Sequence, residues 1–372
     1  MTGLDAIQSA MDQAVQDGVF PGAVLAVRQD GAVRALVVAG RLSTDPPGNQ
    51  VQPSTIYDLA SLTKPLVTVT SILLLVQGGK LEVENAIQTI LPELSGSSIG
   101  PASLRDLLTH SSGLPGWRPL YERLELKGLV AGGTPPSAIR QAVLELIRDE
   151  PLIYGRGERS LYSDLGFILL GFAVERLAGV SLDEYFEEMI AGPSGARPLL
   201  FTPLKLRIKT FPIDPSIIAP TERDVRKGRC LRGEVHDDNA AAMAGVAGHA
   251  GLFGTAEAVL RVSGAWLQAH RGKKSMLDQE LVREFTKRQS QIAQSSWALG
   301  WDTPSSLSSS GAYFSTASFG HLGYTGTSLW IDPVRELEVL LLSNRVHPTR
   351  TNEKIKAFRP LIHDLIFAEL CV

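Results

Sequence analysis

The chain has 372 residues, and its 36 Lys and Arg against 39 Asp and Glu leave a formal net charge of −3. Hydrophobic residues make up 44% of it, which is typical of a globular protein with enough material for two or three structural units. No long run of Lys and Arg interrupts this balance, so the composition excludes the electrostatic footprint of a protein that binds nucleic acid or an anionic membrane. We therefore expect a small molecule as the partner, while the oligomeric state stays open.

Cysteine usage and the N-terminal residues bear on the cellular compartment. Cys230 and Cys371 are too few for a disulfide framework. From Leu4 onward, apolar residues recur at helical spacing, which predicts an amphipathic helix and not a signal peptide. The longest apolar stretch, around residues 66–76, is shorter than the roughly 20 residues that a bilayer span needs. We expect a cytoplasmic protein, or a periplasmic one if a signal peptide precedes this sequence.

Strands are expected near both ends of the chain. After the first helix, two apolar segments flank Asp30-Gly31, a strong hairpin signal. A second antiparallel set comes late in the sequence, followed by a last helix that ends near Leu370 and that Pro360 kinks or restarts. The strands are predicted at residues 23–28, 32–39, 327–331 and 337–342, with a further one ending at His321.

The middle of the chain has helical periodicity instead. Helices are predicted at residues 61–77, 104–109, 137–148, 164–177, 256–268 and 277–287, and another opens with the capping-box pattern Ser181-x-x-Glu184. Strands at both ends around a helical middle predict an α/β (α+β) fold, in which an antiparallel sheet built from both termini is flanked by helices. We expect residues 1–57 and 291–372 to form the sheet unit, residues 58–290 a mainly helical unit, and the active site to lie between them.

The segment Ser61-Leu62-Thr63-Lys64 opens a strongly apolar helix and is the only Ser-x-x-Lys in the chain. Positions i and i+3 share one face of a helix, so the Lys64 ammonium is expected beside the Ser61 hydroxyl. A serine hydroxyl is a weak nucleophile that needs an adjacent base, and a lysine that has lost its proton can serve. The helix N-terminus adds N–H groups for a developing oxyanion. Taken alone, the pattern fits a helix N-cap with a solvated lysine equally well.

Two later segments strengthen the catalytic interpretation. Tyr162 stands at the start of another predicted helix, about 100 residues on. It can present its phenol to the same site, where a neighbouring ammonium would lower its pKa and let it move protons. The segment from His321 to Thr327 lies at the edge of the C-terminal strands, and its glycines allow a substrate to approach the backbone closely. A helix cap and ordinary turn glycines would explain each of these segments alone.

In this order and at these separations, the three segments resemble the serine β-lactamase and penicillin-binding protein family, in particular its class C-like, β-lactamase-related hydrolases and esterases. The matches are Ser61 to Lys64 for Ser-x-x-Lys, Tyr162 to Asp164 for Tyr-x-Asn, and His321 to Gly323 for Lys-Thr-Gly, with accessory stretches at residues 107–114 and 245–253. The resemblance covers nearly the whole chain. It implies a β-lactamase/transpeptidase-like fold and an oxyanion hole made by the backbone N–H groups of Ser61 and Tyr324.

Two departures from the family pattern affect the expected substrate. Asp164 stands where the family has Asn, which brings a charge that can pair with Lys64 but no amide N–H. His321 and Leu322 replace the Lys and Thr that the family uses to hold a β-lactam carboxylate. We expect His321 to be mostly neutral at pH 7 and to gain a proton below about pH 6, with better cephalosporin turnover there. We therefore favour esterase activity and assign substrate binding to Asp164, His321, Leu322 and Gly323.

Other chemistries are weighed against this one. Ser98 lies in a Gly-x-Ser-x-Gly sequence, but no buried strand precedes it and Pro101 follows directly, unlike the nucleophile elbow of α/β-hydrolases. We expect no metal and no other cofactor, because no pair of candidate ligands has the short helical spacing that places two of them on one face. The side chains weighed as metal ligands, and interpreted as loop residues near the active-site rim, are His110, His236, Asp237, Asp238 and His249.

The sequence thus predicts a serine hydrolase that acts through an acyl-enzyme on a small ester, amide or β-lactam. Ser61, Lys64 and Tyr162 are the expected catalytic residues, and whether Lys64 or Tyr162 is the general base stays open. The alternatives are a penicilloyl-accepting sensor or scaffold with negligible turnover, and a true class C β-lactamase or D-Ala peptidase.

Overall fold

A computed structural model describes residues 3–45, 48–130, 133–201, 213–306 and 308–370, so Cys371 lies outside the described residues. The strands are β1 (Gly22–Gln29), β2 (Ala32–Gly40), β3 (Tyr57–Asp58), β4 (Leu199–Phe201), β5 (Arg223–Asp224), β6 (Arg229–Cys230), β7 (Leu252–Gly254), β8 (Phe319–Leu322), β9 (Ser328–Asp332) and β10 (Leu337–Ser343). The α-helices are α1 (Gly3–Gln16), α2 (Thr70–Gln77), α3 (Ile87–Ile90), α4 (Leu104–Leu108), α5 (Leu120–Leu126), α6 (Pro136–Arg148), α7 (Asp164–Ala178), α8 (Leu182–Phe186), α9 (Gly192–Ser194), α10 (Asp238–Ala242), α11 (Ala256–His270), α12 (Gln279–Thr286) and α13 (Ile355–Leu370). Shorter turns are the 3₁₀ segments η1 (Ala60–Leu62), η3 (Pro92–Leu94) and η5 (Pro215–Ile217), and the π segments η2 (Lys64–Val69) and η4 (Glu187–Ala191).

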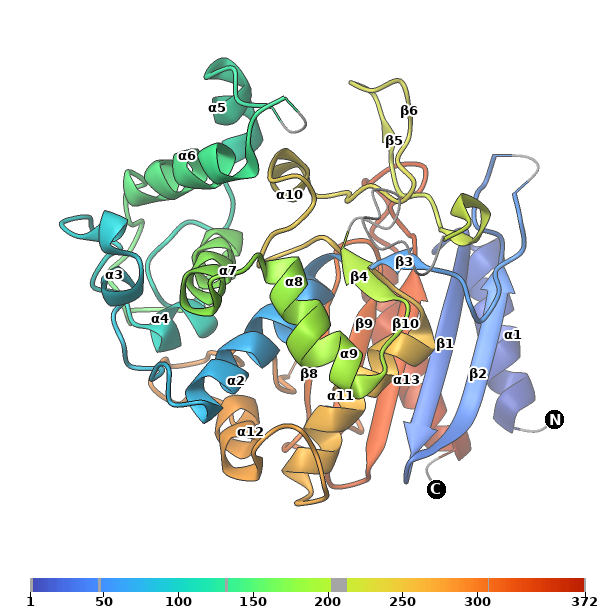
Figure 1. Ribbon diagram of the computed structural model, residues 1–372. Coiled ribbons are helices and arrows are strands. Elements are labelled where there is room, and N and C mark those ends of the chain that lie inside the picture. The colour runs from blue at the N-terminus through green and yellow to red at the C-terminus, as the bar shows by residue number, and fades with distance from the viewer. Residues whose placement is uncertain (1–2, 46–47, 131–132, 202–212, 307, 371–372) are drawn as a thin grey trace.

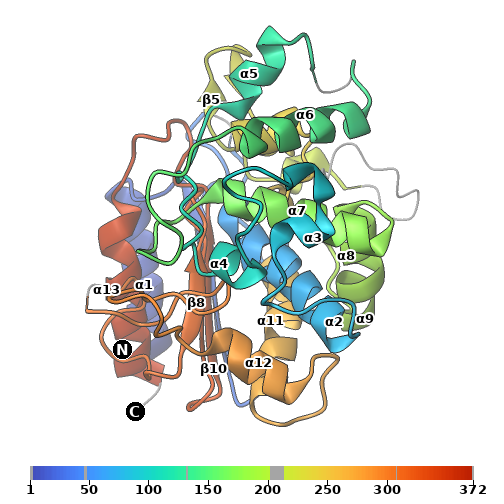
Figure 2. The same ribbon diagram turned by 90° about the vertical axis from the view of Figure 1, so that its left-hand side faces the viewer.

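A five-stranded antiparallel sheet, in the order β2-β1-β10-β9-β8, is built from the two ends of the chain, as predicted (Figure 1). Asp30 and Gly31 join β1 to β2 with positive φ angles, as a tight hairpin turn requires. Along β1, Leu25 belongs to the core under α1 and α13, whereas Val24 belongs to the core on the helical side. Figure 2 shows the sheet nearly edge-on between α1 and α13 on one side and most of the helices on the other.

The expected boundaries between a sheet unit and a helical unit stay a prediction. All five strands of the sheet fall outside residues 58–290, but α11, which falls inside that range, packs directly on the sheet. Arg28 of β1 donates a hydrogen bond of 2.6 Å to the carbonyl of Leu260 on α11. Helix α13 runs through Pro360 as one element, so the helix does not restart there, and a kink at Pro360 stays a prediction.

The helix expected over residues 61–77 is divided into η1, η2 and α2. Within the π segment, the backbone N–H and the hydroxyl of Thr70 both reach the carbonyl of Pro65, five residues earlier. Such π turns inside helices are frequent at functional sites. The segment Ala60–Gln77 is apolar and long enough to pass for a membrane span by composition, but 78% of it is buried inside the protein, as in the core helix of a globular domain.

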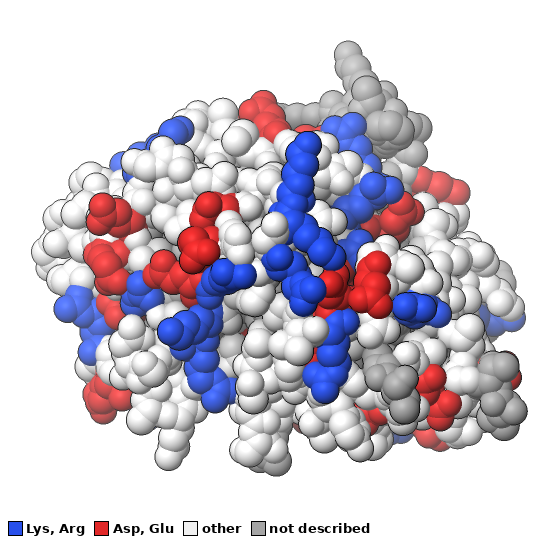
Figure 3. Space-filling view, turned by 90° about the horizontal axis from the view of Figure 1, so that it is seen from below, with Lys and Arg blue, Asp and Glu red and all other residues white. Residues whose placement is uncertain are grey.

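Acidic and basic side chains are interspersed on the surface. Figure 3 shows this on the face that carries the loops around α12, where small groups of both signs lie next to one another. The ion pair between Arg271 and Glu336, at 2.6 Å, and that between Lys273 and Glu336 are examples of such mixed groups. This distribution agrees with the near-zero net charge of the sequence.

Candidate active site

Ser61 is presented by a short strand that the sequence analysis did not predict. β3 pairs with β7, and the N–H of Leu59 then donates to the carbonyl of Leu252 at 2.9 Å. The Asp58 carboxylate accepts the N–H of Ala60 at 2.8 Å, and Ala60 has a left-handed φ of 48°. This conformation is uncommon for a residue with a side chain, and it turns the chain sharply into η1. As a result the half-buried Ser61 side chain lies at the first turn of the helical run.

Lys64 is fully buried, and three acceptors surround its ammonium. Its Nζ lies 3.1 Å from Ser61 Oγ, 2.6 Å from Asp164 Oδ1 and 3.1 Å from the carbonyl oxygen of His249. Burial alone would lower the pKa of Lys64, but attraction to Asp164 and Tyr162 and the hydrogen bonds outweigh it and raise the pKa above its ordinary value. The resting site therefore holds Lys64 as an ammonium ion that donates to the Ser61 hydroxyl.

Tyr162 precedes α7, and the centre of its ring lies 4.8 Å from Lys64 Nζ. Its phenol faces the side chains of Ser61 and Lys64. Burial raises the pKa of Tyr162, the Lys64 ammonium offsets only part of this, and the Asp164 charge raises it further. The expectation of a lowered tyrosine pKa is therefore wrong, because desolvation of the phenolate outweighs the attraction of one ammonium ion.

His110, directly after Thr109 at the end of α4, fixes the loop that carries Tyr162. Its Nδ1 accepts the N–H of Ser163 at 3.0 Å, and its carbonyl accepts the N–H of Leu161 at 2.8 Å. The rings of His110 and Tyr162 lie 4.6 Å apart, and Trp297 packs against both, at 4.4 Å and 5.6 Å. Burial lowers the pKa of His110 well below its ordinary value, so this ring is a neutral part of the wall.

The turn after β8 is bonded to the segment that leads into the serine. Thr325 Oγ1 donates to the carbonyl of Asp58 at 2.7 Å, and Thr327 Oγ1 donates to the carbonyl of Leu59 at 3.1 Å. A Cβ at Gly323 would lie 2.6 Å from the Leu59 carbonyl oxygen and 1.9 Å from Thr327 Oγ1. Glycine is therefore needed at position 323 because the protein packs against itself there.

The backbone of this turn is held from behind by two buried arginines. Arg345 Nε donates to the carbonyl of Tyr324 at 2.8 Å, and Arg359 donates to the carbonyl of Gly323 at 2.9 Å. In the described part of the chain, neither the N–H of Ser61 nor that of Tyr324 has an acceptor. Both amides can therefore still donate a hydrogen bond.

His321 is buried on β8, beside the half-buried Leu322. Its Nδ1 donates a hydrogen bond to the Leu322 carbonyl at 2.8 Å, so the proton of the neutral ring is on Nδ1 and Nε2 carries the lone pair. Nε2 has no hydrogen-bond partner among the described residues. Burial, assisted by the positive charge of Lys64, lowers the pKa of His321 to about 3. The expectation that His321 gains a proton below about pH 6 is therefore wrong, because a buried imidazolium is too poorly solvated.

In the described structure, the other candidate nucleophile, Ser98, and the candidate metal ligands lack the surroundings that their chemistry would require. Ser98 is exposed in the loop between η3 and α4, without the strand before it and the helix after it that a nucleophile elbow requires. His236 Nε2 lies 3.1 Å from Glu222, and His249 Nε2 lies 2.7 Å from Asp237. Within the described ranges, no three His, Cys, Asp or Glu side chains gather as a metal site would require.

Sequence reasoning gave no role to the histidines of the two accessory stretches. Residues 107–114 contain His110, which lies against Tyr162, and residues 245–253 contain His249, whose carbonyl accepts from Lys64. Both had been interpreted as rim residues. A signal was available, because each is the single histidine of a stretch that resembles the family, which is a poor place for an incidental side chain.

Comparison with known proteins agrees with this geometry. The sequence model of the Beta-lactamase family matches residues 7–363. A Salmonella heidelberg (strain SL476) protein named "Putative D-alanyl-D-alanine carboxypeptidase" is 33% identical over 324 residues, covering 81% of this chain and 72% of that protein. Unliganded simvastatin synthase (LovD) from Aspergillus terreus superposes with a TM-score of 0.74 at 20% identity, over 100% of this chain and 99% of that one. The octameric penicillin-binding protein homologue from Pyrococcus abyssi gives 0.72 at 19% identity, over 98% and 77%. The chain therefore belongs to the Beta-lactamase family and is a serine hydrolase with the β-lactamase/transpeptidase fold.

Proposed function

We propose that this enzyme hydrolyses small neutral esters through an acyl-enzyme on Ser61. Ser61 Oγ attacks the ester carbonyl carbon, and its proton passes to the Lys64–Tyr162 pair. The tetrahedral intermediate then expels the alcohol, which leaves with a proton from that pair. Water, activated with the help of Tyr162, cleaves the acyl–serine bond and releases the carboxylic acid. The contact of Lys64 with Ser61, at 3.1 Å, and the position of the Tyr162 phenol beside both support these roles.

Two routes for the Ser61 proton follow from the contacts. It passes either to the amine of Lys64 or to the phenolate of Tyr162, whichever has first lost its own proton to solvent. The pKa of each group is raised, so both routes need a proton to be lost from a site that holds it tightly at neutral pH. Asp164 contributes to both of these raised pKa values, and for this reason we assign it the tuning of the pair.

The oxyanion of the tetrahedral intermediate is proposed to lie between the backbone N–H groups of Ser61 and Tyr324. Support comes from the hydrogen bonds of Thr325 and Thr327 to the carbonyls of Asp58 and Leu59, which join the turn that carries Tyr324 to the segment before Ser61. The positive end of the helical run adds to this stabilisation, because its first N–H groups point toward the developing charge.

The observation that carries the preference for neutral esters is the state of His321. The family's usual cation is replaced by a buried neutral ring whose Nε2 is an acceptor with no partner in the described residues. A substrate carboxylate bound beside His321 would face the lone pair of Nε2, although it needs a positively charged donor at that position. A short-chain ester makes no such contact, and the apolar Leu322 beside the ring suits it better than an anionic β-lactam.

We expect the wild-type enzyme to hydrolyse p-nitrophenyl acetate or butyrate well and penicillins poorly. The missing charge-assisted hydrogen bond costs about 1.5–3 kcal/mol, or roughly ten- to a hundredfold in kcat/KM for the anionic substrate. The double change His321→Lys with Leu322→Thr should shift the ratio of the two kcat/KM values toward β-lactams by a similar factor. Leu322→Thr alone, which keeps the neutral ring, is the control. Efficient penicillin hydrolysis at pH 7.5 without measurable esterase activity would contradict this account while leaving the role of Ser61 intact.

The pH dependence of this selectivity is a separate expectation. Because the pKa of His321 is lowered to about 3, the ring gains a proton only as the pH falls through that value. The ratio of cephalosporin to ester kcat/KM should therefore stay constant between pH 8 and about pH 5, whatever happens to the two rates themselves. Steady-state rates with both substrates across this range provide the measurement. A rise of the ratio between pH 7 and 5 would show that His321 titrates in that window.

A D-alanyl carboxypeptidase activity is the second candidate, since the Salmonella relative at 33% identity is named for it. Peptides ending in D-Ala-D-Ala carry the carboxylate that His321 disfavours, so the same substrate panel decides between the two. A penicilloyl-accepting sensor is the third outcome. Such a sensor would form an acyl-enzyme with a penicillin or nitrocefin but would hydrolyse neither that compound nor an ester. Mass spectrometry would show that the acyl group stays on the protein, which distinguishes a sensor from an enzyme.

A further inference from the structure

We propose that Asp237 and His249 are positioning residues for Lys64. Asp237 holds the imidazole of His249, and the loop fixed in this way presents the backbone carbonyl of His249 to the Lys64 ammonium. The inference rests on the proposed function, in which Lys64 takes part in proton transfer.

The contacts form an unbroken chain from a helix to the lysine. Asp237 Oδ1 accepts the N–H of Ala240 at 2.7 Å, which caps α10, and the same oxygen lies 2.7 Å from His249 Nε2. The carbonyl of His249 lies 3.1 Å from Lys64 Nζ. His249 is buried, and its Nδ1 has no partner among the described residues, so the contact with Asp237 is its single side-chain anchor there.

The loop that carries His249 lies wedged between the Lys64 helix and α7. Thr68 Oγ1 donates to the carbonyl of Gly248 at 2.6 Å. A Cβ at Gly248 would lie 2.1 Å from the carbonyl oxygen of Phe167, and a Cβ at Gly171 would lie 2.9 Å from the Cα of Gly248. The backbone is thus packed too closely for larger residues. This explains Gly248 of the accessory stretch at residues 245–253, because its close packing brings the neighbouring His249 carbonyl to Lys64.

Charged and titratable groups reach Lys64 from several elements. Asp164 and Tyr162 act from the start of α7, His110 and His321 are neutral rings, and Asp237 acts from the start of α10. Burial would raise the pKa of Asp237, but His249, the N–H of Ala240 and Lys64 together lower it, so the carboxylate is ionised. Removal of the negative charge of Asp237 should therefore also lower the pKa of Lys64.

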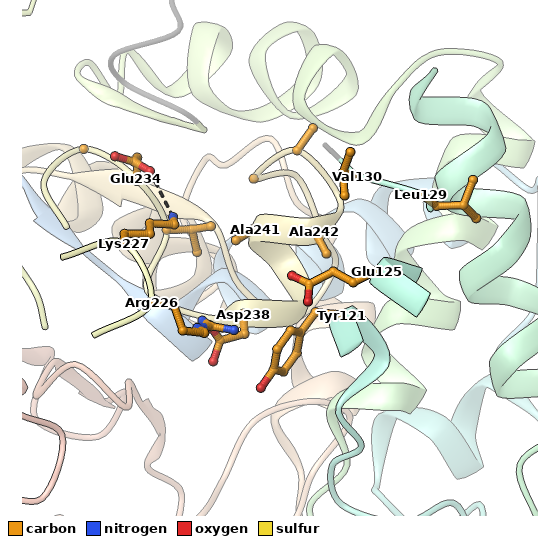
Figure 4. Close-up of a pocket in the computed structure, with 14 residues that line it drawn as sticks. Tyr121, Glu125, Leu129, Val130, Arg226, Lys227, Glu234, Asp238, Ala241 and Ala242 are labelled. Atoms are coloured by element: carbon orange, nitrogen blue, oxygen red, sulfur yellow. Dashed lines mark hydrogen bonds and ion pairs between the residues drawn. The ribbon is translucent and has the colours of Figure 1, made fainter. Parts of the chain in front are cut away.

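The adjacent residue, Asp238, provides a matched comparison because its carboxylate has other partners. It pairs with Arg226 and, at 3.6 Å, with Arg350. Figure 4 shows Asp238 beside Arg226 at a cavity of about 420 Å³ that Tyr121 and Glu125 of α5 also line. Of these two successive aspartates, Asp237 caps α10 and contacts His249, whereas Asp238 contacts neither His249 nor Lys64 among the described residues.

The test compares three variants of the full chain with a neutral p-nitrophenyl ester. Asp237→Ser keeps a good helix cap but cannot reach His249 with a carboxylate. Asp238→Ser is the matched control, because it makes the same substitution at the neighbouring aspartate. Asp237→Asn is the conservative variant, since its Oδ1 can still accept from both Ala240 and His249. Thermal melting of each variant shows whether it is folded.

We expect Asp237→Ser to lower kcat on the order of ten- to a hundredfold with KM unchanged, because a small displacement of a catalytic group is costly and the substrate contacts are assigned to other segments. Asp238→Ser should stay within about twofold of wild type. Asp237→Asn should recover most of kcat and move the acid limb of its pH profile to lower pH, since a negative charge near Lys64 is lost.

Equal rates for the two serine variants, or an Asp237→Asn variant as slow as Asp237→Ser with an unshifted profile, would overturn the proposal. If Asp237→Ser does not fold, the pH profile of Asp237→Asn against that of Asp238→Asn decides it. Failure of the proposed function is recognised separately, because then the wild-type enzyme itself would not hydrolyse the ester, or Ser61→Ala would retain the activity.

Discussion

Replacement of Ser61 by alanine is expected to remove both ester turnover and covalent labelling by a fluorophosphonate probe. The acyl-enzyme needs the Ser61 oxygen, and Ser61 Oγ is the serine hydroxyl that contacts the Lys64 ammonium, at 3.1 Å. Loss of a nucleophile leaves only the contribution of binding and the oxyanion site, so kcat should fall on the order of 10⁴-fold or more. Initial rates and in-gel fluorescence of the labelled protein measure the two effects.

The matched control is Ser98→Ala, at the exposed serine of the Gly-x-Ser-x-Gly sequence. It should leave rate and labelling unchanged, because no base lies beside it in the described contacts. Loss of labelling in Ser98→Ala together with full labelling of Ser61→Ala would replace the Ser-x-x-Lys mechanism by that of an α/β-hydrolase.

Replacement of Asp164 by asparagine is expected to move the acid limb of the pH–rate profile to lower pH. Asp164 raises the pKa of Lys64 through an ion pair of 2.6 Å, and its charge also raises the pKa of Tyr162. Activity requires that Lys64 or Tyr162 lose a proton, so the rate increases as the pH rises toward the pKa of the pair. This increase is the acid limb of the profile. An opposite charge at this distance shifts a pKa by about one to three units, so the limb should move by a comparable amount.

At a fixed pH below the limb, this shift raises the rate of Asp164→Asn over wild type by roughly tenfold for each unit. The outcome does not depend on which of Lys64 and Tyr162 is the base, because Asp164 acts on both in the same direction. Asp164→Glu, which keeps the charge, is the control and should keep the alkaline position of the limb. Superimposable profiles for wild type and Asp164→Asn would show that Asp164 does not govern the proton-transfer pair.

The sequence by itself determined the local elements and the identity of the chemical groups. The Asp30-Gly31 hairpin and the helices over residues 137–148 and 256–268 follow from turn chemistry and apolar spacing, which act within one segment. The Ser61–Lys64 contact also follows locally, because a helical turn brings positions i and i+3 together. Together with the two later motifs that resemble the family in order and separation, this contact predicts a serine hydrolase without the tertiary structure.

Only the tertiary structure decided the backbone conformation, the burial and the pKa values of those groups. Ala60 takes its left-handed conformation next to Asp58 and strand β3, which pairs with a strand about 200 residues away. The raised pKa of Tyr162 and the lowered pKa of His321 come from burial by segments that are distant in sequence. Desolvation depends on every atom that excludes water from a group, so no motif encodes it. The sequence therefore predicts the acyl-transfer groups, and packing sets which of them carry charge.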